Sequence, residues 1–89
     1  MKYTLYATDA FLKSFEMFSP KRQEIILSKI DLLAENPDHP SLRTEKLYKG
    51  TKKRTRASSI NMDIRLIWEL ENDTIKLLDV GKHDIYREY

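Results

Sequence analysis

Two alternating segments decide the fold of this chain, and both lie in the stretch INMDIRLIWELENDTIKLLDVGK, residues 60–82. Within residues 64–70 the apolar side chains at the even-numbered positions share one side, while Arg65, Ile67 and Glu69 share the other, which is the period of a β-strand. Residues 74–80 form a second strand-like run. Asn and Asp residues stand before and between the two runs, where they favour tight turns. Short turns between successive strands predict antiparallel pairing.

The first half of the chain has the signals of two helices. Residues 2–6 alternate like a short strand, and residues 8–9, a Thr and an Asp, can each cap a first helix that ends near Phe18. Ser19-Pro20 opens a second helix, with serine as the N-cap and proline at the first helical position. Asn36-Pro37 stops it, because proline disfavours helical geometry in the residue before it.

This order of elements predicts an α+β domain. It consists of a strand, a helical hairpin and then a three- to four-stranded antiparallel sheet, built from residues 42–48, 53–60, 64–70 and 74–80. We expect the helices to cover one face of the sheet and to leave the other face, or its concave edge, open. The 89 residues fit a single domain, 1–89, without a linker or an internal repeat.

The composition excludes several classes of protein. With 40% hydrophobic and 34% charged residues, the chain is too hydrophobic to be disordered and too polar for a membrane protein. No apolar run approaches the roughly 20 residues of a membrane span, and the N-terminus does not resemble a signal peptide. We therefore expect a cytoplasmic protein. The absence of cysteine excludes disulfides, thiolate metal sites and a cysteine nucleophile. The two histidines, His39 and His83, are far apart, so we expect neither a metal nor a cofactor.

The charge is concentrated in one part of the chain, residues 43–56, which we call the basic segment. It holds seven cations and one anion, a balance of +6, whereas residues 1–42 carry −1 and residues 57–89 carry −3, which together give the net +2. Such a segment suits a polyanion, because each neutralised phosphate releases counterions. The alternative is a solvated loop that is merely rich in lysine.

The second half of the chain holds candidates for each part of a metal-free RNA cleavage site. Such a site needs a base for the ribose 2′-hydroxyl, cations for the phosphorane-like transition state, an acid for the leaving 5′-oxygen and an aromatic face for a base. The candidates are Glu45, Lys46, Arg54, Arg56, Arg65, His83, Tyr86 and Tyr89.

Each candidate also has a structural interpretation. Arg65 is suited to bidentate phosphate binding, or it pairs with a neighbouring acid across the sheet. His83 is a general acid, or simply an exposed residue at a strand end. Glu45 is a base, or it neutralises an adjacent cation of the basic segment. Tyr86 and Tyr89 stack on bases, or pack the C-terminus against the sheet.

The chain resembles the RelE/ParE superfamily of bacterial toxins, on its RelE/YoeB-like ribonuclease side. The resemblance covers nearly the whole chain. It depends on Asn36-Pro37 followed by residues 42–47, on the run SINMDIRLIW at residues 59–68, and on LLDVGKHDIY at residues 77–86. The strand arginine followed by aliphatics and an aromatic, together with the Val-Gly-Lys ending of the last strand, is a moderately specific pair of motifs.

The resemblance implies an mRNA interferase, a metal-independent endoribonuclease that often acts in the ribosomal A site. Arg65 matches the arginine that contacts the scissile phosphate, His83 the acid or phosphate ligand, Glu45 the base of YoeB-like members, and Tyr86 the tyrosine that stacks on the message. The implied RNA-binding residues are Lys46, Arg54, Arg56, Lys82 and Tyr89.

The resemblance also implies a cognate antitoxin, with operator DNA contacted only through that antitoxin. Two alternatives stay open. The superfamily contains ParE-like gyrase inhibitors with the same fold, and a non-catalytic relative that only binds an antitoxin would look similar.

Overall fold

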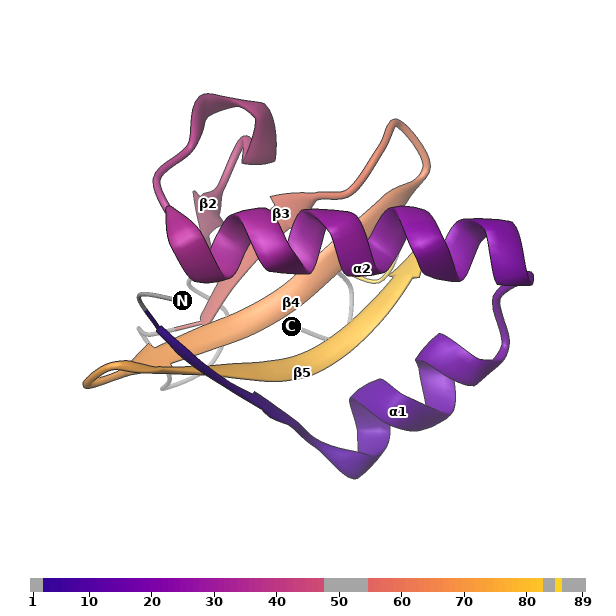
Figure 1. The fold of residues 1–89 in the computed structure, drawn as a ribbon, viewed down its shortest axis with the longest axis horizontal. Coiled ribbons are helices and arrows are strands. Elements are labelled where there is room, and N and C mark those ends of the chain that lie inside the picture. Colours follow the sequence, from indigo (N-terminus) through magenta and orange to yellow (C-terminus); the bar gives the residue numbers. More distant parts are fainter. Residues whose placement is uncertain (1–2, 48–54, 83–84, 86–89) are drawn as a thin grey trace.

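The computed structural model describes residues 3–47, 55–82 and 85, and their order confirms the predicted α+β class (Figure 1). The elements are β1 (Thr4–Ala7), α1 (Asp9–Glu16), α2 (Pro20–Glu35), a short 3₁₀ helix η1 (Pro40–Leu42), β2 (Glu45–Lys46), β3 (Thr55–Ser59), β4 (Ile64–Glu71) and β5 (Thr74–Lys82).

The strands form a five-stranded mixed sheet in the order β1-β5-β4-β3-β2. The sequence predicted three to four antiparallel strands, and the difference is β1, which pairs in parallel with β5 from Thr4↔Thr74 to Ala7↔Leu77. Alternation at residues 2–6 identifies a strand but does not identify its partner. The four strands β2 to β5 pair antiparallel, as predicted.

Both helices begin where their capping residues predict. The Thr8 hydroxyl accepts from the N–H of Phe11 at 3.2 Å, and the Ser19 hydroxyl accepts from the N–H of Arg22 at 3.4 Å. The second helix ends at Glu35 with Asn36 as its cap, as expected before a proline. None of the helices in the described part of the chain is both long and apolar enough to span a membrane.

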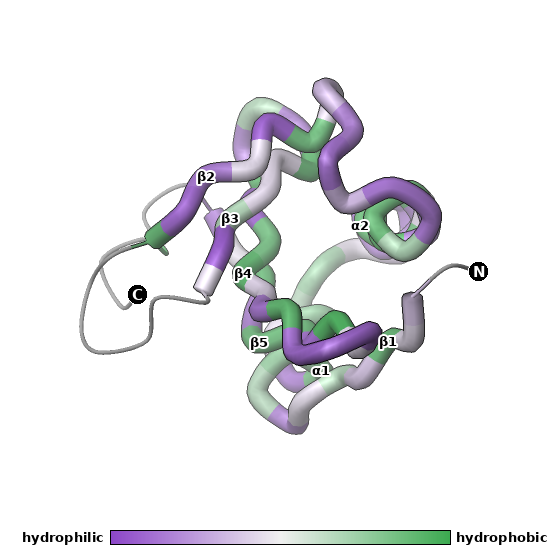
Figure 2. The backbone as a smooth tube through the Cα atoms, turned by 90° about the vertical axis from the view of Figure 1, so that its left-hand side faces the viewer, coloured by the Kyte–Doolittle hydropathy of each residue, from purple (hydrophilic) through white to green (hydrophobic). Residues whose placement is uncertain are grey.

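The core lies between α2 and one face of the sheet. Figure 2 shows α2 nearly end-on, beside the sheet. Ile26, Ile30 and Leu33 of α2 belong to the same buried cluster as Leu66 and Trp68 of β4. Ile64, Leu66 and Trp68, three successive even-numbered residues of β4, therefore lie on the core face, as the alternation predicted.

The opposite face of the sheet, which we call the distal face, is not open at its centre. Residues directly paired on neighbouring strands share a face. Ala57 and Ile67 pair with each other on the distal face, lie outside the core cluster, and are both 0% exposed. Part of this face is covered next to Gly81, where an added Cβ would lie 3.0 Å from Cδ1 of Ile85. The expected open face is thus replaced by a largely buried one.

Candidate functional site

Arg65 lies at the start of β4, on the distal face, with its guanidinium held by the turn that precedes it. Its Nη1 donates to the carbonyl oxygens of Asn61 at 2.6 Å, Ile64 at 3.1 Å and Met62 at 3.3 Å. Asn61 also shapes this turn, because its Oδ1 accepts from the N–H groups of Asp63 and Ile64, each at 2.8 Å. The predicted Asn–Asp turn therefore has a second use, since it supplies the carbonyls that fix the arginine.

Arg65 does not pair with an acidic residue of a neighbouring strand in the described part of the chain, which was its structural interpretation. No ion pair of Arg65 is found within residues 3–47, 55–82 and 85, and the hydrogen bonds of its guanidinium there all come from Nη1. Glu71 instead pairs with Lys76 at 3.7 Å. Within the described residues, the other N–H donors of the guanidinium have no hydrogen-bond partner. Arginine keeps its charge and presents a planar fork that suits a phosphate.

Glu45 lies on the same face as Arg65. It pairs with Ala57, and Arg65 pairs with Ser59, two residues further along β3. Their Cα atoms are thus separated by two strand spacings, roughly 10 Å, and by two residues along the strand, roughly 7 Å. Glu45 is exposed, and in the described part of the chain its carboxylate has no ion pair with a cation of the basic segment.

Lys46 and Arg56 lie on the opposite face from Glu45 and Arg65. They pair with each other, and Arg56 also pairs with Trp68 of the core face. The guanidinium carbon of Arg56 lies 5.9 Å from the centroid of the Trp68 ring, within the range of a cation–π contact. The structure therefore divides the predicted cationic set between the two faces of the sheet.

Lys82 also lies on the α2 side of the sheet. It pairs with Ile64, a core residue, and contributes to a pocket beside the α1–α2 turn. Its neighbour Gly81 pairs with Arg65 on the distal face. The other predicted site residues, Arg54, His83, Tyr86 and Tyr89, lie outside the described residues.

A chain of hydroxyl groups next to Glu45 was not found by sequence reasoning. Nε1 of Trp68 donates to Oγ of Ser58 at 2.8 Å, and Ser58 Oγ lies 2.7 Å from Oγ1 of Thr44. Ser58 is fully buried. The signal that could have found this chain is the in-facing Ser58, a polar residue at a core position of β3.

The described part of the chain offers no metal centre. It has no group of three or more His, Asp or Glu side chains placed to hold an ion, and the chain has no cysteine. His39, the described histidine, instead stabilises η1, because its Nδ1 accepts from the Ser41 N–H at 3.1 Å. The groups that the distal face brings together are therefore a fixed arginine and an exposed carboxylate, which suit charge stabilisation and proton transfer.

Comparisons with known proteins give matches among solved structures. No protein-family model matches the sequence, and no curated protein matches it either. A copper-bound mutant toxin from Helicobacter pylori is 24% identical, with a TM-score of 0.72, over 93% of this chain and 97% of that chain.

Two further matches are complexes. A chain of the archaeal RelE-RelB complex from Pyrococcus horikoshii OT3 is 19% identical, with a TM-score of 0.76, over 92% of this chain and 96% of that chain. A chain of the E. coli DinJ-YafQ toxin-antitoxin complex is 17% identical, with a TM-score of 0.75, over 96% and 97%. These likenesses show that the chain has the fold of the RelE-type toxins, which confirms the resemblance at the level of the fold.

Proposed function

We propose that this chain is the toxin of a type II toxin–antitoxin pair, and that it is a metal-independent endoribonuclease that cleaves mRNA on the ribosome and so stops translation. The fold supports the proposal, because the chain matches a toxin and a chain of a toxin–antitoxin complex over nearly their whole length. Fold alone does not fix activity, so the argument for cleavage comes from the site.

The observation that carries the proposal is the position of Arg65. Its Nη1 is bound to the turn at 2.6 Å, which holds the charge on the distal face before any substrate arrives. A preorganised cation stabilises a phosphorane-like transition state without reorganising during the reaction. Glu45 stands on the same face with an exposed carboxylate. Both groups thus face the side from which an RNA strand would approach.

The proposed reaction needs one proton removed and one supplied. Glu45 takes the proton of the ribose 2′-hydroxyl, and the 2′-oxygen forms a bond to the adjacent phosphorus. The bond from phosphorus to the 5′-oxygen breaks, and His83 gives that oxygen a proton. The products are a 2′,3′-cyclic phosphate and a 5′-hydroxyl. Tyr86 holds the unstacked base, while Tyr89, Lys46, Arg54 and Arg56 supply further RNA contacts.

An induction experiment with three arginine variants tests the proposal. Translation is followed by incorporation of labelled methionine, and mRNA ends are mapped by primer extension. We expect Arg65→Ala to lower the cleavage rate about 10²–10³-fold, the usual cost of losing one transition-state donor. Arg65→Lys keeps the charge without the planar fork and should be intermediate. Arg22→Ala, on an exposed arginine of α2, should cleave like the wild type.

The folded state and the product ends are the controls. Circular dichroism of purified Arg65→Ala checks that the loss of the bonds to the turn has not unfolded the domain. The downstream fragments should accept label from polynucleotide kinase without prior phosphatase treatment, because they carry a 5′-hydroxyl. A folded Arg65→Ala variant that cleaves normally contradicts the proposal. So does wild-type induction that damages DNA and leaves messages intact, which is the outcome expected of a gyrase inhibitor.

The same proposal gives the chain an antitoxin as its partner. Two of the similar structures are complexes, DinJ-YafQ and RelE-RelB. In this chain, Leu12 of α1, Met17 directly after α1 and Leu27 of α2 are 44%, 88% and 50% exposed. We propose that these side chains belong to the surface that the antitoxin covers, since large exposed apolar patches mark protein interfaces. Operator DNA would be contacted through the antitoxin.

A further inference from the structure

A pocket of about 650 Å³ lies between the α1–α2 turn and the end of β5. Met17 and Phe18 of the turn line one side, Arg22 in the first turn of α2 lines another, and Val80 and Lys82 of β5 complete it. In Figure 1 the turn between the helices and the end of β5 lie toward the same side of the domain. The volume is in the range of pockets that receive a ligand or an anchoring side chain.

The pocket has an apolar part that is not fully covered. Met17 is 88% exposed, whereas its neighbour Phe18 is half-buried against the core. Methionine is flexible and polarisable, so it adapts to the shape of an incoming apolar side chain. The apolar floor, Val80, is 2% exposed. An apolar group that enters here therefore meets side chains of its own kind.

The rim of the pocket is positive. Arg22 and Lys82 are both exposed, and within residues 3–47, 55–82 and 85 neither charged group has a hydrogen bond or an ion pair. Among the described residues, none of those that line the pocket is acidic. The nearby carboxylate of Asp79 accepts from the Ser14 hydroxyl at 2.6 Å and from the Val80 N–H at 2.8 Å, so it is already engaged. The edge of this apolar pocket thus carries two exposed cations, which are suited to bind carboxylates.

We propose that this pocket binds an acidic peptide segment of a partner protein, with an apolar side chain in the pocket and flanking carboxylates at Arg22 and Lys82. Apolar anchors with a charged rim are the usual anatomy of such interfaces. The inference rests on the proposed function in one respect, because it takes the antitoxin as the source of the segment.

An RNA strand fits the pocket less well than a peptide. Lys82 pairs with Ile64 and lies on the α2 side of the sheet, whereas Arg65 lies on the distal face. The most exposed apolar side chain of the pocket is Met17, which offers a base neither a ring to stack on nor a hydrogen-bond donor. A segment bound here would thus hold the toxin without covering Arg65. The partner would need a different part of its chain to block the site.

The test is a titration of the full-length, ¹⁵N-labelled chain with short synthetic peptides, followed by amide chemical shifts. The probe is acetyl-Glu-Glu-Leu-Glu-Glu-amide. Its controls are the same peptide with lysines in place of the glutamates, the same peptide with serine in place of leucine, and a pentauridylate. We expect saturable shifts confined to residues 14–22 and 80–82 with the acidic leucine peptide alone.

Two variants show whether the pocket residues are responsible. Arg22→Glu should raise the peptide Kd about fivefold to tenfold, and Met17→Ala should raise it by a smaller factor. Neither residue takes part in the proposed RNA site, so both variants should cleave mRNA at the wild-type rate. Peptide binding and cleavage are separate readouts, and failure of one leaves the other standing.

Four results would overturn the inference. They are no binding at millimolar peptide, equal binding of the lysine peptide, an unchanged Kd for Arg22→Glu, and pentauridylate shifts at these same amides, which would make the pocket an RNA subsite. Shifts that fall on β3 and β4 of the distal face would likewise exclude the pocket as the binding site.

Discussion

At the scale of single residues, Trp68 connects the core to two candidate site residues, the cation Arg56 and, through Ser58 and Thr44, the acid Glu45. Its ring lies 5.9 Å from the guanidinium carbon of Arg56, and its Nε1 donates to Ser58, which contacts Thr44, the residue before Glu45. An indole N–H is a donor only, so Ser58 must accept from it, and its own hydroxyl bond then joins β3 to the start of β2. These hydrogen bonds hold β2, the short strand that carries Glu45.

Replacing Ser58 by alanine should therefore destabilise the domain. The variant leaves the buried Nε1 of Trp68 without its acceptor, which costs about 1–3 kcal/mol of unfolding free energy. Urea unfolding followed by Trp68 fluorescence measures it. Ser28→Ala is the matched control, because Ser28 is exposed and bonds only the Ile25 carbonyl of its own helix, at 3.1 Å. Equal stability of the two variants would show that the hydroxyl chain contributes nothing.

Residue chemistry was predictable where one pattern sufficed. Alternation in 64–70 places Arg65 opposite the core residues Leu66 and Trp68, and the structure agrees. Alternation in residues 53–60 is weaker, because small and polar residues stand on both sides of β3. The face of Arg56 was therefore not readable, and the burial of Ala57 was not expected.

At the scale of elements, α1 is joined to α2 by a single amide side chain. Nε2 of Gln23 donates to the carbonyl oxygens of Phe15 at 3.2 Å and Phe18 at 3.0 Å. The last carbonyls of a helix lack partners within the helix. The Phe15 carbonyl therefore accepts from the Phe18 N–H at 3.1 Å as well as from Gln23. The helical hairpin was predicted from its caps, but this link was not, because glutamine in an amphipathic pattern looks like an ordinary surface residue.

Gln23→Ala should loosen the hairpin. The loss of two hydrogen bonds, each with a net contribution of about 0.5–1.5 kcal/mol, lowers the unfolding free energy by about 1–3 kcal/mol. Lys21→Ala, at an exposed position of α2 two residues before Gln23, should change the unfolding free energy by less than about 0.5 kcal/mol. The measurement is the midpoint of urea unfolding at constant m-value. A midpoint for Gln23→Ala equal to that of Lys21→Ala would remove Gln23 from the account of the hairpin.

Strand β1 shows the limit of prediction at this scale. Its pattern marks a strand, and Leu5 packs on the core as expected from the alternation. Its place beside β5 depends on contacts between the two ends of the chain, such as Thr4 N–H to the Asp73 carbonyl at 2.9 Å and Thr8 N–H to the Leu77 carbonyl at 3.1 Å. No local pattern contains that information, since the paired residues are about 70 positions apart in the sequence.

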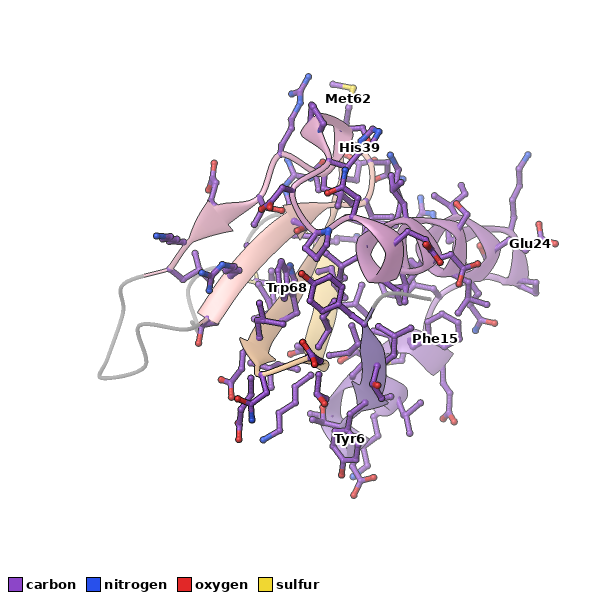
Figure 3. All side chains as sticks on the ribbon, turned by 60° about the vertical axis from the view of Figure 1, so that its left-hand side comes forward. Tyr6, Phe15, Glu24, His39, Met62 and Trp68 are labelled. Carbon is purple, nitrogen blue, oxygen red and sulfur yellow. The ribbon has the colours of Figure 1, made fainter. Side chains whose placement is uncertain are left out.

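At the scale of the whole molecule, charge and fold are distributed differently. The basic segment carries +6 in a chain whose net charge is +2, and the described part of that segment spans both faces of the sheet, with Glu45 on one and Lys46 on the other. Met62, labelled in Figure 3, lies in the β3–β4 turn and is 90% exposed, and its carbonyl oxygen accepts from Nη1 of Arg65 at 3.3 Å. Arg65 and Lys46 lie on opposite faces of the sheet, and β2 is its edge strand. An RNA strand held at Arg65 therefore reaches Lys46 only by passing around β2.

This geometry makes a prediction about salt. Binding to a single-stranded RNA weakens with log[salt] with a slope of about −0.7 per neutralised phosphate. If the strand passes around the β2 edge, Lys46→Gln reduces the magnitude of the slope by about 0.7, whereas Lys21→Gln, an exposed lysine of α2, leaves it unchanged. Fluorescence anisotropy of a labelled oligonucleotide between 50 and 300 mM salt, about the range over which such slopes are linear, supplies both values. If Lys46→Gln, Lys21→Gln and Arg65→Lys all leave the salt slope unchanged, the RNA is confined to the distal face. In that case the cations on the α2 side of the sheet have another use, of which the partner-binding pocket is the one with a structural basis.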